Sequence, residues 1–538
     1  MNASIPISPR QLSLLVLIIA VSLIAMGSMR PSSDTIDPGS NTVAPQENDL
    51  SGEKVGKAED LVKDWPKPDF VLFVTGRQHG YIEPCGCITL ERQKGGLMRR
   101  HSVKKVLEKR GWPLVAIDAG NQIRRTGNQP EIKLMKTYEA LSKEMKYDVI
   151  GLGPDDLKLP PIEVAQKMAN NMPTINSHAP FTSANAQVLG QVDPFQIIVR
   201  NGKKIGVTTV LGDEHLAGVK QPGLDLKAVG ASLGPVIARM NAANCDMKVL
   251  VAFTSLNNCR TLAKNFPVFD VLVTAGGAGD PTLHPEIIKA GGHTTSMIQV
   301  GVKGMYVGLV GVFATDPKKP LRYERVELDH RYKDSEEIKR VFKAYQAELK
   351  DRWIAGTLAD IRPREHPSGH SFVGSDACAD CHGDEFDIWK DGPDGDWGPH
   401  AEATEDLEEN PNDNRVWVQR DYDPECMSCH GTGWNPQNFF PYKTGLIDPA
   451  NADKLTGNGC ENCHGPGSAH VDIQKKKDSG VAVDEKLRKK LADEMVLTLE
   501  EARAGACKEC HDLDNSPDFL KEGGFDEYWP HIEHGGDE

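Results

Sequence analysis

The residues most able to do chemistry in this chain are cysteines and histidines that recur in one pattern. Two cysteines stand three positions apart and a histidine follows directly, as in "CADCH", "CMSCH", "CENCH" and "CKECH". All four copies lie in the last third of the 538-residue chain. The cysteines are Cys378, Cys381, Cys426, Cys429, Cys460, Cys463, Cys507 and Cys510, and the histidines are His382, His430, His464 and His511.

This spacing is typical of covalent attachment of c-type haem. The two thiols form thioether bonds to the haem vinyl groups, and the adjacent histidine becomes the proximal ligand of the iron. A zinc site needs no histidine directly after every second cysteine, and neither does a disulfide framework. The sequence therefore predicts four covalently bound c-type haems. The porphyrins are expected to form much of the core of this region, close enough together for fast electron transfer.

The remaining histidines of this region bear on what each iron does. An iron with two histidine ligands carries electrons, whereas an open sixth position can bind a small molecule. The candidate distal ligands outside the attachment motifs are His366, His370, His400, His470, His531 and His534.

Four stretches around the motifs together resemble the tetrahaem cytochrome c family of electron carriers, which includes the redox partner of hydroxylamine oxidoreductase. They are "SFVGSDACADCHGDEFDIWKDGPDGDWGPHAEAT", "YDPECMSCHGTGWN", "GNGCENCHGPGSAH" and "CKECHDLDNSPDF…FDEYWPHIEHG". The resemblance implies that His400, His470 and His534 are distal ligands, although the segment before His400 looks longer than usual for the family. It leaves the fourth distal ligand open. An enzyme that acts on a small nitrogen or sulfur compound at a five-coordinate haem is therefore the alternative to an electron carrier.

The chain between residues 67 and 330 has a different pattern. Short apolar runs that end in glycine or turn residues indicate buried strands, separated by segments with helical spacing. This alternation predicts an α/β layered domain. The runs are "DFVLFVTG", "WPLVAIDAG", "YDVIGLG", "KKIGVTTVLG", "DMKVLVAFT" and "FDVLVTAGG".

The order of these strand ends resembles the metallophosphoesterase domain of the 5′-nucleotidase family, which binds two metal ions through Asp, His and Asn side chains. Of the first motif only His79 is kept, and Arg77, Asn121 and Asp155 replace an Asp, an Asp and a His of the family. A two-metal hydrolase needs both ions to clamp the attacking and leaving oxygens. The expectation is a metallophosphoesterase-like fold whose phosphatase activity is lost.

A possible further site lies in "HGYIEPCGC", on the loop after the first predicted strand. It consists of His79, Cys85 and Cys87. The two cysteines could bind a metal or act as a redox pair, and a disulfide between them or no role at all is equally compatible with the sequence.

The N-terminus predicts export. Arg10 precedes an apolar run from Leu12 to about Met29, whose length lies between that of a signal peptide and that of a minimal membrane span. We expect the rest of the chain on the periplasmic side of the inner membrane, or free in the periplasm if the segment is cleaved. The expected organisation is a signal anchor or signal peptide at 1–29, a flexible linker at 30–66, the metallophosphoesterase-like domain at 67–330, a connecting helix at 331–365, and a mostly helical and irregular multihaem cytochrome c domain at 366–538.

The net charge of the chain limits the classes of partner that it is expected to bind. A formal net charge of −15 argues against nucleic acid as a main partner. The expected partners are redox proteins, and the membrane through the N-terminal anchor. An electron carrier is favoured over an enzyme, and a third interpretation gives the middle domain a binding or docking role.

Overall fold

The computed structural model describes residues 57–84, 93–124, 128–172, 179–358, 361–395, 398–410, 417–447, 454–513 and 515–535. The predicted N-terminal helix at 1–29 lies outside these ranges, as do Cys85 and Cys87. Within the ranges, no helix combines the length and apolar character needed to cross a membrane. The chain after Val55 forms one compact unit.

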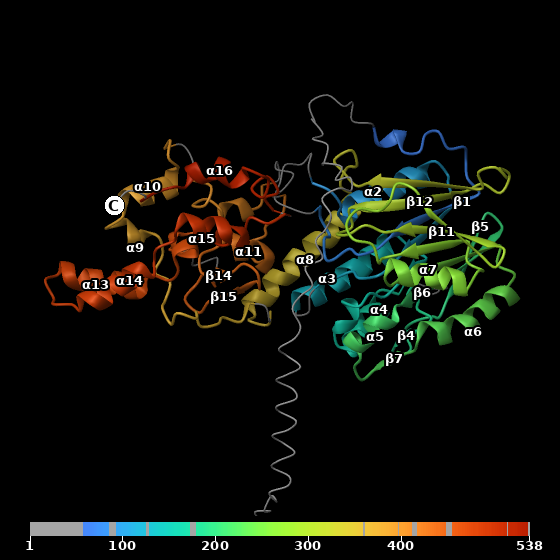
Figure 1. Ribbon diagram of the computed structural model, residues 1–538, viewed down its shortest axis with the longest axis horizontal. Helices are drawn as coiled ribbons and strands as arrows, with labels where there is room; N and C mark the ends of the chain where they lie inside the picture. The colour runs from blue at the N-terminus through green and yellow to red at the C-terminus, as the bar shows by residue number, and fades with distance from the viewer. Residues whose placement is uncertain are drawn as a thin grey trace, which may run out of the picture. The chain divides into compact units, whose positions relative to one another are not determined.

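Two β-sheets form the middle of the α/β part (Figure 1), in the strand orders β13-β12-β1-β2-β3 and β10-β11-β9-β8-β6-β5. All six apolar runs of the sequence are strands, which confirms the α/β prediction. The first sheet contains β1 (Phe70–Thr75), β2 (Leu114–Asp118), β3 (Val149–Ile150), β12 (Tyr306–Val312) and β13 (Leu321–Glu327). The second contains β5 (Gln196–Arg200), β6 (Lys203–Leu211), β8 (Met247–Phe253), β9 (Val271–Thr274), β10 (Glu286–Ala290) and β11 (His293–Gln299), and a separate pair is formed by β4 (Ala186–Val188) and β7 (Leu224–Leu226).

Alternate side chains of the central strand β1 enter two different cores, because successive residues of a strand point to opposite faces. Leu72 packs between the two sheets with Val249 of β8. Val71 and Phe73 pack on the outer face of the first sheet, in the core that also contains residues of α2 (Leu97–Lys109), α3 (Asn128–Glu139) and α8 (Glu336–Ile354). Helices α6 (Val229–Ala242) and α7 (Leu256–Asn265) cover the outer face of the second sheet. The layers are therefore helix, sheet, sheet and helix.

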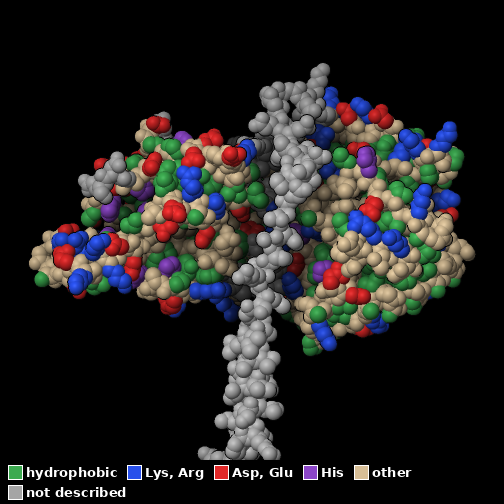
Figure 2. All heavy atoms as spheres, in the orientation of Figure 1, with side chains coloured by type: hydrophobic (Ala, Val, Ile, Leu, Met, Phe, Trp, Pro, Cys, Tyr) green, Lys and Arg blue, Asp and Glu red, His purple; other side chains and the backbone are tan. Residues whose placement is uncertain are grey.

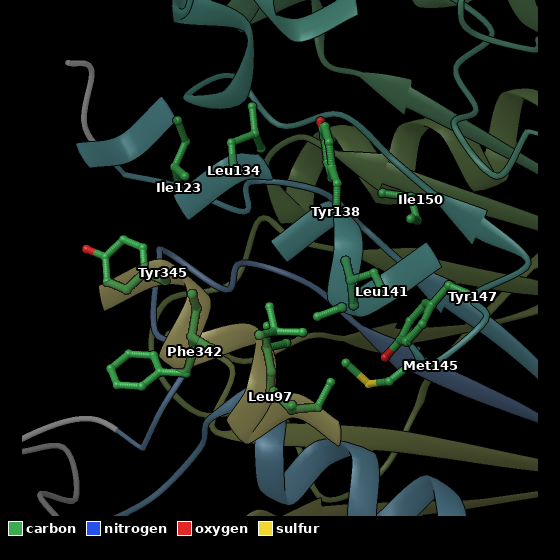
Figure 3. Close-up of a cluster of buried hydrophobic side chains, with 14 of the residues drawn as sticks. Leu97, Ile123, Leu134, Tyr138, Leu141, Met145, Tyr147, Ile150, Phe342 and Tyr345 are labelled. Atoms are coloured by element: carbon green, nitrogen blue, oxygen red, sulfur yellow. The ribbon is translucent and has the colours of Figure 1, made fainter. Parts of the chain in front are cut away.

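Helix α8 is the predicted connecting helix. The Ser335 hydroxyl caps its start by accepting a hydrogen bond from the Ile338 backbone N–H at 3.4 Å. Figure 3 shows Phe342 and Tyr345 of this helix in one apolar cluster with Tyr138 of α3. Apolar residues that recur at helical spacing along α8 are buried, namely Ile338, Val341, Phe342, Tyr345 and Leu349.

The C-terminal part consists of short helices and turns. Three attachment motifs lie on or begin in α9 (Asp376–Ala379), α11 (Pro424–His430) and α12 (Cys460–His464), and the fourth begins in a 3₁₀ turn, Ala506–Glu509. Figure 2 shows histidine side chains at the surface of this part, among interspersed acidic and basic side chains. An apolar cluster near the C-terminus has Ala502, Phe519 and Phe525 as its buried members. The other elements are α10 (Gly383–Asp391), α13 (Ser468–Asp478), α14 (Glu485–Asp493), α15 (Leu499–Ala504), α16 (Gly524–Tyr528), β14 (Trp434–Asn435) and β15 (Phe440–Pro441).

Candidate haem-binding site

Three of the motif histidines each face a histidine from a distant segment of the chain. The ring centroids of His382 and His470 are 6.4 Å apart. Those of His511 and His400 are 6.0 Å apart, and those of His464 and His534 are 5.8 Å apart. Each pair thus joins one predicted proximal ligand to one predicted distal ligand.

These separations fit an iron ion held between two imidazole rings. Two metal–nitrogen bonds of about 2 Å, with about 1.2 Å from each ligating nitrogen to its ring centre, put the centroids roughly 6 Å apart. The residues present therefore fit a bis-histidine haem at each of the three pairs.

Hydrogen bonds to the backbone hold several of these rings in one tautomer. Nδ1 of His464 donates to the Met495 carbonyl at 2.6 Å, and Nδ1 of His534 donates to the Ile532 carbonyl at 2.7 Å. Nδ1 of His430 donates to a backbone carbonyl in the same way. A proton on Nδ1 leaves Nε2 free to bind a metal ion, which is the usual arrangement of a haem-ligating histidine.

Burial keeps these imidazoles neutral, as iron ligation requires. Burial, with smaller contributions from the neighbouring His511 and His430, lowers the pKa of His400 to about 4. Burial also lowers the pKa of His464 and of His470. At neutral pH these rings therefore carry no proton that competes with a metal ion.

The attachment motifs lie against one another in pairs. The Cys378 thiol of the first motif lies near the Cys460 thiol of the third. The Cys429 thiol of the second motif lies near the Cys510 thiol of the fourth. Cys463 of the third motif lies near a cysteine of the fourth. Contacts between motifs thus run continuously in the order first, third, fourth, second.

The two residues between the cysteines of "CENCH" fasten three segments together, a role that the sequence analysis missed. The buried Glu461 carboxylate accepts hydrogen bonds from the backbone N–H groups of Val373, Gly374 and Gly467 at 2.7–3.0 Å. The Asn462 side chain bonds to the backbone that follows the second motif. Burial of the glutamate is the signal that could have identified this role, and burial is not visible in the sequence.

The other candidate ligands lie elsewhere. The ring of His366 packs against Tyr442, with centroids 4.7 Å apart, and its Nδ1 is 2.8 Å from the Ser368 hydroxyl. Nε2 of His370 is 3.7 Å from the Glu494 carboxylate. His531 lies in a short 3₁₀ turn, Trp529–His531.

The strand ends at which a two-metal centre would lie carry an arginine and two side chains that bond to each other. The Arg77 guanidinium donates to the Gly277 carbonyl, so a cation lies between the loops that follow β1 and β9. Asn121 and Asp155 satisfy each other through two hydrogen bonds of 2.9 Å. Burial, and then the charge of Arg77, lowers the pKa of His79 to about 4. These residues do not fit two divalent metal ions.

Left-handed backbone at the same strand ends marks these loops as strained. Arg77, His79 and Asn121 have φ angles of 52°, 55° and 63°, a conformation that residues with a Cβ rarely adopt. Within the described ranges, no group of three or more His, Cys, Asp or Glu side chains is arranged to hold a metal ion. The C-x-C site falls outside those ranges and stays a prediction.

The paired histidines and attachment motifs define a c-type cytochrome segment, joined to an α/β part. Residues 377–465, which hold the first three motifs, match the family described as cytochrome c554 and c-prime. A curated relative, cytochrome c-554 of Nitrosomonas europaea, is 34% identical over 103 residues, which are 18% of this chain and 39% of the relative. The resemblance predicted from the motifs is confirmed for this segment, and it implies covalently bound c-type haem. The chain spans about two fifths of that relative's length.

Solved structures similar to this chain include nucleotidases. The 5′-nucleotidase precursor of Thermus thermophilus matches with a TM-score of 0.45 and 18% identity. The match covers 57% of this chain and 62% of the precursor. A sulfate thiohydrolase of Thermus thermophilus has a TM-score of 0.42 and 14% identity over 54% of this chain and 62% of its own. The NAD nucleotidase of Haemophilus influenzae has a TM-score of 0.41 and 14% identity over 53% of this chain and 60% of the nucleotidase. At these values, the likeness transfers no activity, metal or substrate to this chain.

Proposed function

We propose that the chain is an exported multihaem c-type cytochrome that transfers electrons, with four haems attached through the four C-x-x-C-H motifs. The observation that carries this proposal is the set of three histidine pairs at the centroid separation of two imidazoles on one iron. When bound, the haem supplies one-electron exchange between ferric and ferrous iron. The chain supplies the thiols, the axial imidazoles, and the hydrogen bonds that orient them.

The contacts between motifs support a continuous electron route. Neighbouring thiols link the first motif to the third and the second to the fourth. A further pair of nearby cysteines links the third to the fourth. Porphyrins attached at such neighbouring cysteines would be close together, and this favours transfer of electrons from haem to haem.

The location and partners are part of the same proposal. The apolar segment within residues 1–29 directs export and anchors the chain to the inner membrane, or leaves it in the periplasm after cleavage. Redox proteins donate electrons to the haems and accept electrons from them. The relative named cytochrome c-554 supports a carrier of this class.

The test begins with haem content and spin state. Mass spectrometry of the matured protein should give four covalent haems, and low-temperature EPR of the oxidised protein should be dominated by low-spin signals. We would record spectra with and without nitrite, hydroxylamine or carbon monoxide, using His470→Ala as a control with one deliberately opened iron. Wild-type spectra that do not change when any of the three ligands is added support the proposed electron carrier.

Two other results would change the conclusion. A high-spin signal in the wild type that shifts on ligand addition, as in the control, would favour the alternative oxidoreductase that acts on a small nitrogen or sulfur compound. A protein without covalent haem would overturn the proposal.

A further inference from the structure

The helix that carries the second attachment motif begins at a buried carboxylate. Asp423 is the N-cap of α11, and its Oδ1 accepts a hydrogen bond from the Glu425 backbone N–H at 3.1 Å. Only 5% of Asp423 is exposed. The helix that it caps contains Cys426, Cys429 and His430, so whatever fixes Asp423 also fixes this motif.

Two glutamines from outside the haem-binding segment hold the same carboxylate. Gln129 of α3 donates to Oδ1 at 2.7 Å, and Gln346 of α8 donates to Oδ2 at 2.9 Å. The two glutamines are only 2% and 5% exposed. With the helix N–H, three donors point at the two oxygens, which is the arrangement of an ionised carboxylate because that group only accepts.

Further contacts join the same segment to the α/β part. Lys133 of α3 forms an ion pair with Glu425, two residues beyond the cap. Glu83, on the loop after β1, accepts hydrogen bonds from Arg420 at 2.9 Å and from the Trp417 indole at 3.1 Å. The α/β part therefore contacts the segment before the second motif at three places.

A helix cap alone would not need the charge of Asp423. Asparagine or serine caps a helix about as well as aspartate, and burying a carboxylate without an ion pair of its own is costly. Burial raises the pKa of Asp423, and the charge of the nearby Lys133, which pairs with Glu425, opposes that rise. A buried negative charge next to a haem stabilises ferric iron over ferrous iron, because the ferric form carries one more positive charge.

We propose that the α/β part acts as a redox-tuning scaffold for the haem attached at Cys426 and Cys429, with Asp423 as the positioning residue through which it acts. The inference rests on the proposed function, since it requires a haem at that motif. It gives a role to an α/β part whose residues no longer fit a two-metal hydrolase. The carboxylate would supply a negative charge at the start of the helix that carries the second motif, and the two glutamines hold that charge in place.

The experiment is a spectroelectrochemical titration of the holoprotein. Asp423→Asn keeps the size and the capping oxygen but removes the charge. The potential of one haem in four should rise, with an increase of about tenfold in its reduced-to-oxidised ratio at a fixed applied potential, and the other three should stay in place. Gln129→Leu leaves Asp423 intact and removes the donor from α3, and it should shift the potential of the same haem.

The matched control is Asp484→Asn. Asp484 also caps a helix, accepting from the Lys486 and Leu487 backbone N–H groups at 2.9 and 3.3 Å, but its helix α14 carries no attachment motif. This control should move no potential. Four unchanged potentials in either Asp423→Asn or Gln129→Leu would overturn the inference, even if the variants unfold more easily. A wild type without haem would instead overturn the proposed function, so the two failures are distinguishable.

Discussion

The replacement of Glu461 by alanine tests whether the haem-binding segments depend on a residue inside an attachment motif. Glu461 is only 2% exposed, and its carboxylate is shared by three backbone N–H groups. Val373 and Gly374 precede the first motif, and Gly467 follows the third. Glu461→Ala therefore removes the acceptor that joins these two segments, without touching a thiol or an axial imidazole.

The magnitude follows from the hydrogen bonds that are lost. A buried donor left without an acceptor costs about 1–3 kcal/mol. Water that enters the space of the missing side chain will accept hydrogen bonds from some of the three backbone N–H groups. We therefore expect a loss of roughly 3–5 kcal/mol in the free energy of unfolding. This is a large share of the total free energy of unfolding of a typical domain, which is about 5–15 kcal/mol.

The assay is urea unfolding of the holoprotein, followed by far-ultraviolet circular dichroism and by the haem absorption band. Glu509→Ala is the matched control, because Glu509 also lies between the two cysteines of a motif but its side chain is exposed. The control should stay within about 0.5 kcal/mol of the wild type. A Glu461→Ala protein as stable as the control would show that the network around this carboxylate does not hold the segments together.

Three further predictions concern histidines. His470→Ala should turn the iron ligated by His382 high-spin in EPR while the other haems stay low-spin, and four unchanged signals would contradict the pairing. The pKa of the buried His101 is lowered from 6.5 to about 4, so the unfolded state binds its proton first and stability should fall by up to about 3 kcal/mol as pH drops from 6.5 to 4. His101→Gln should reduce the dependence of unfolding free energy on pH in this range. An unchanged pH dependence would show that another group causes it. The purified protein should not hydrolyse a generic phosphomonoester with added manganese, and a metal-dependent rate that drops in His79→Ala would show that the hydrolase survives.

Local sequence signals predicted the strands and the attachment motifs because each has a local cause. Covalent attachment fixes the spacing of two thiols and a histidine, so the motif is visible in five residues. Buried strands such as β1 and β8 are continuous apolar runs, because both of their faces are covered. The three distal histidines came from the family resemblance, but their pairing with particular motif histidines was not predicted, since no spacing rule relates His382 to His470.

Contacts over long sequence distances could not be predicted. The sequence does not show that the strands divide into two stacked sheets, nor that β12 returns to pair antiparallel with β1. It does not show that Gln129 donates to Asp423, a residue 294 positions away. The Asp423-Pro424 pair is the signature of a helix start, and it could have placed the beginning of α11, although not its partners.

The adjacent thiols of different motifs have a consequence for how the protein matures. The Cys378 thiol lies near the Cys460 thiol, and the Cys429 thiol lies near the Cys510 thiol. In an oxidising compartment, a chain that folds first would oxidise these pairs to disulfides that join the wrong motifs and block attachment. We therefore expect attachment to precede the final folding of this region. A chain produced without haem should contain these cross-links in mass spectra of unreduced peptides, and free thiols at all four positions would argue against this order of events.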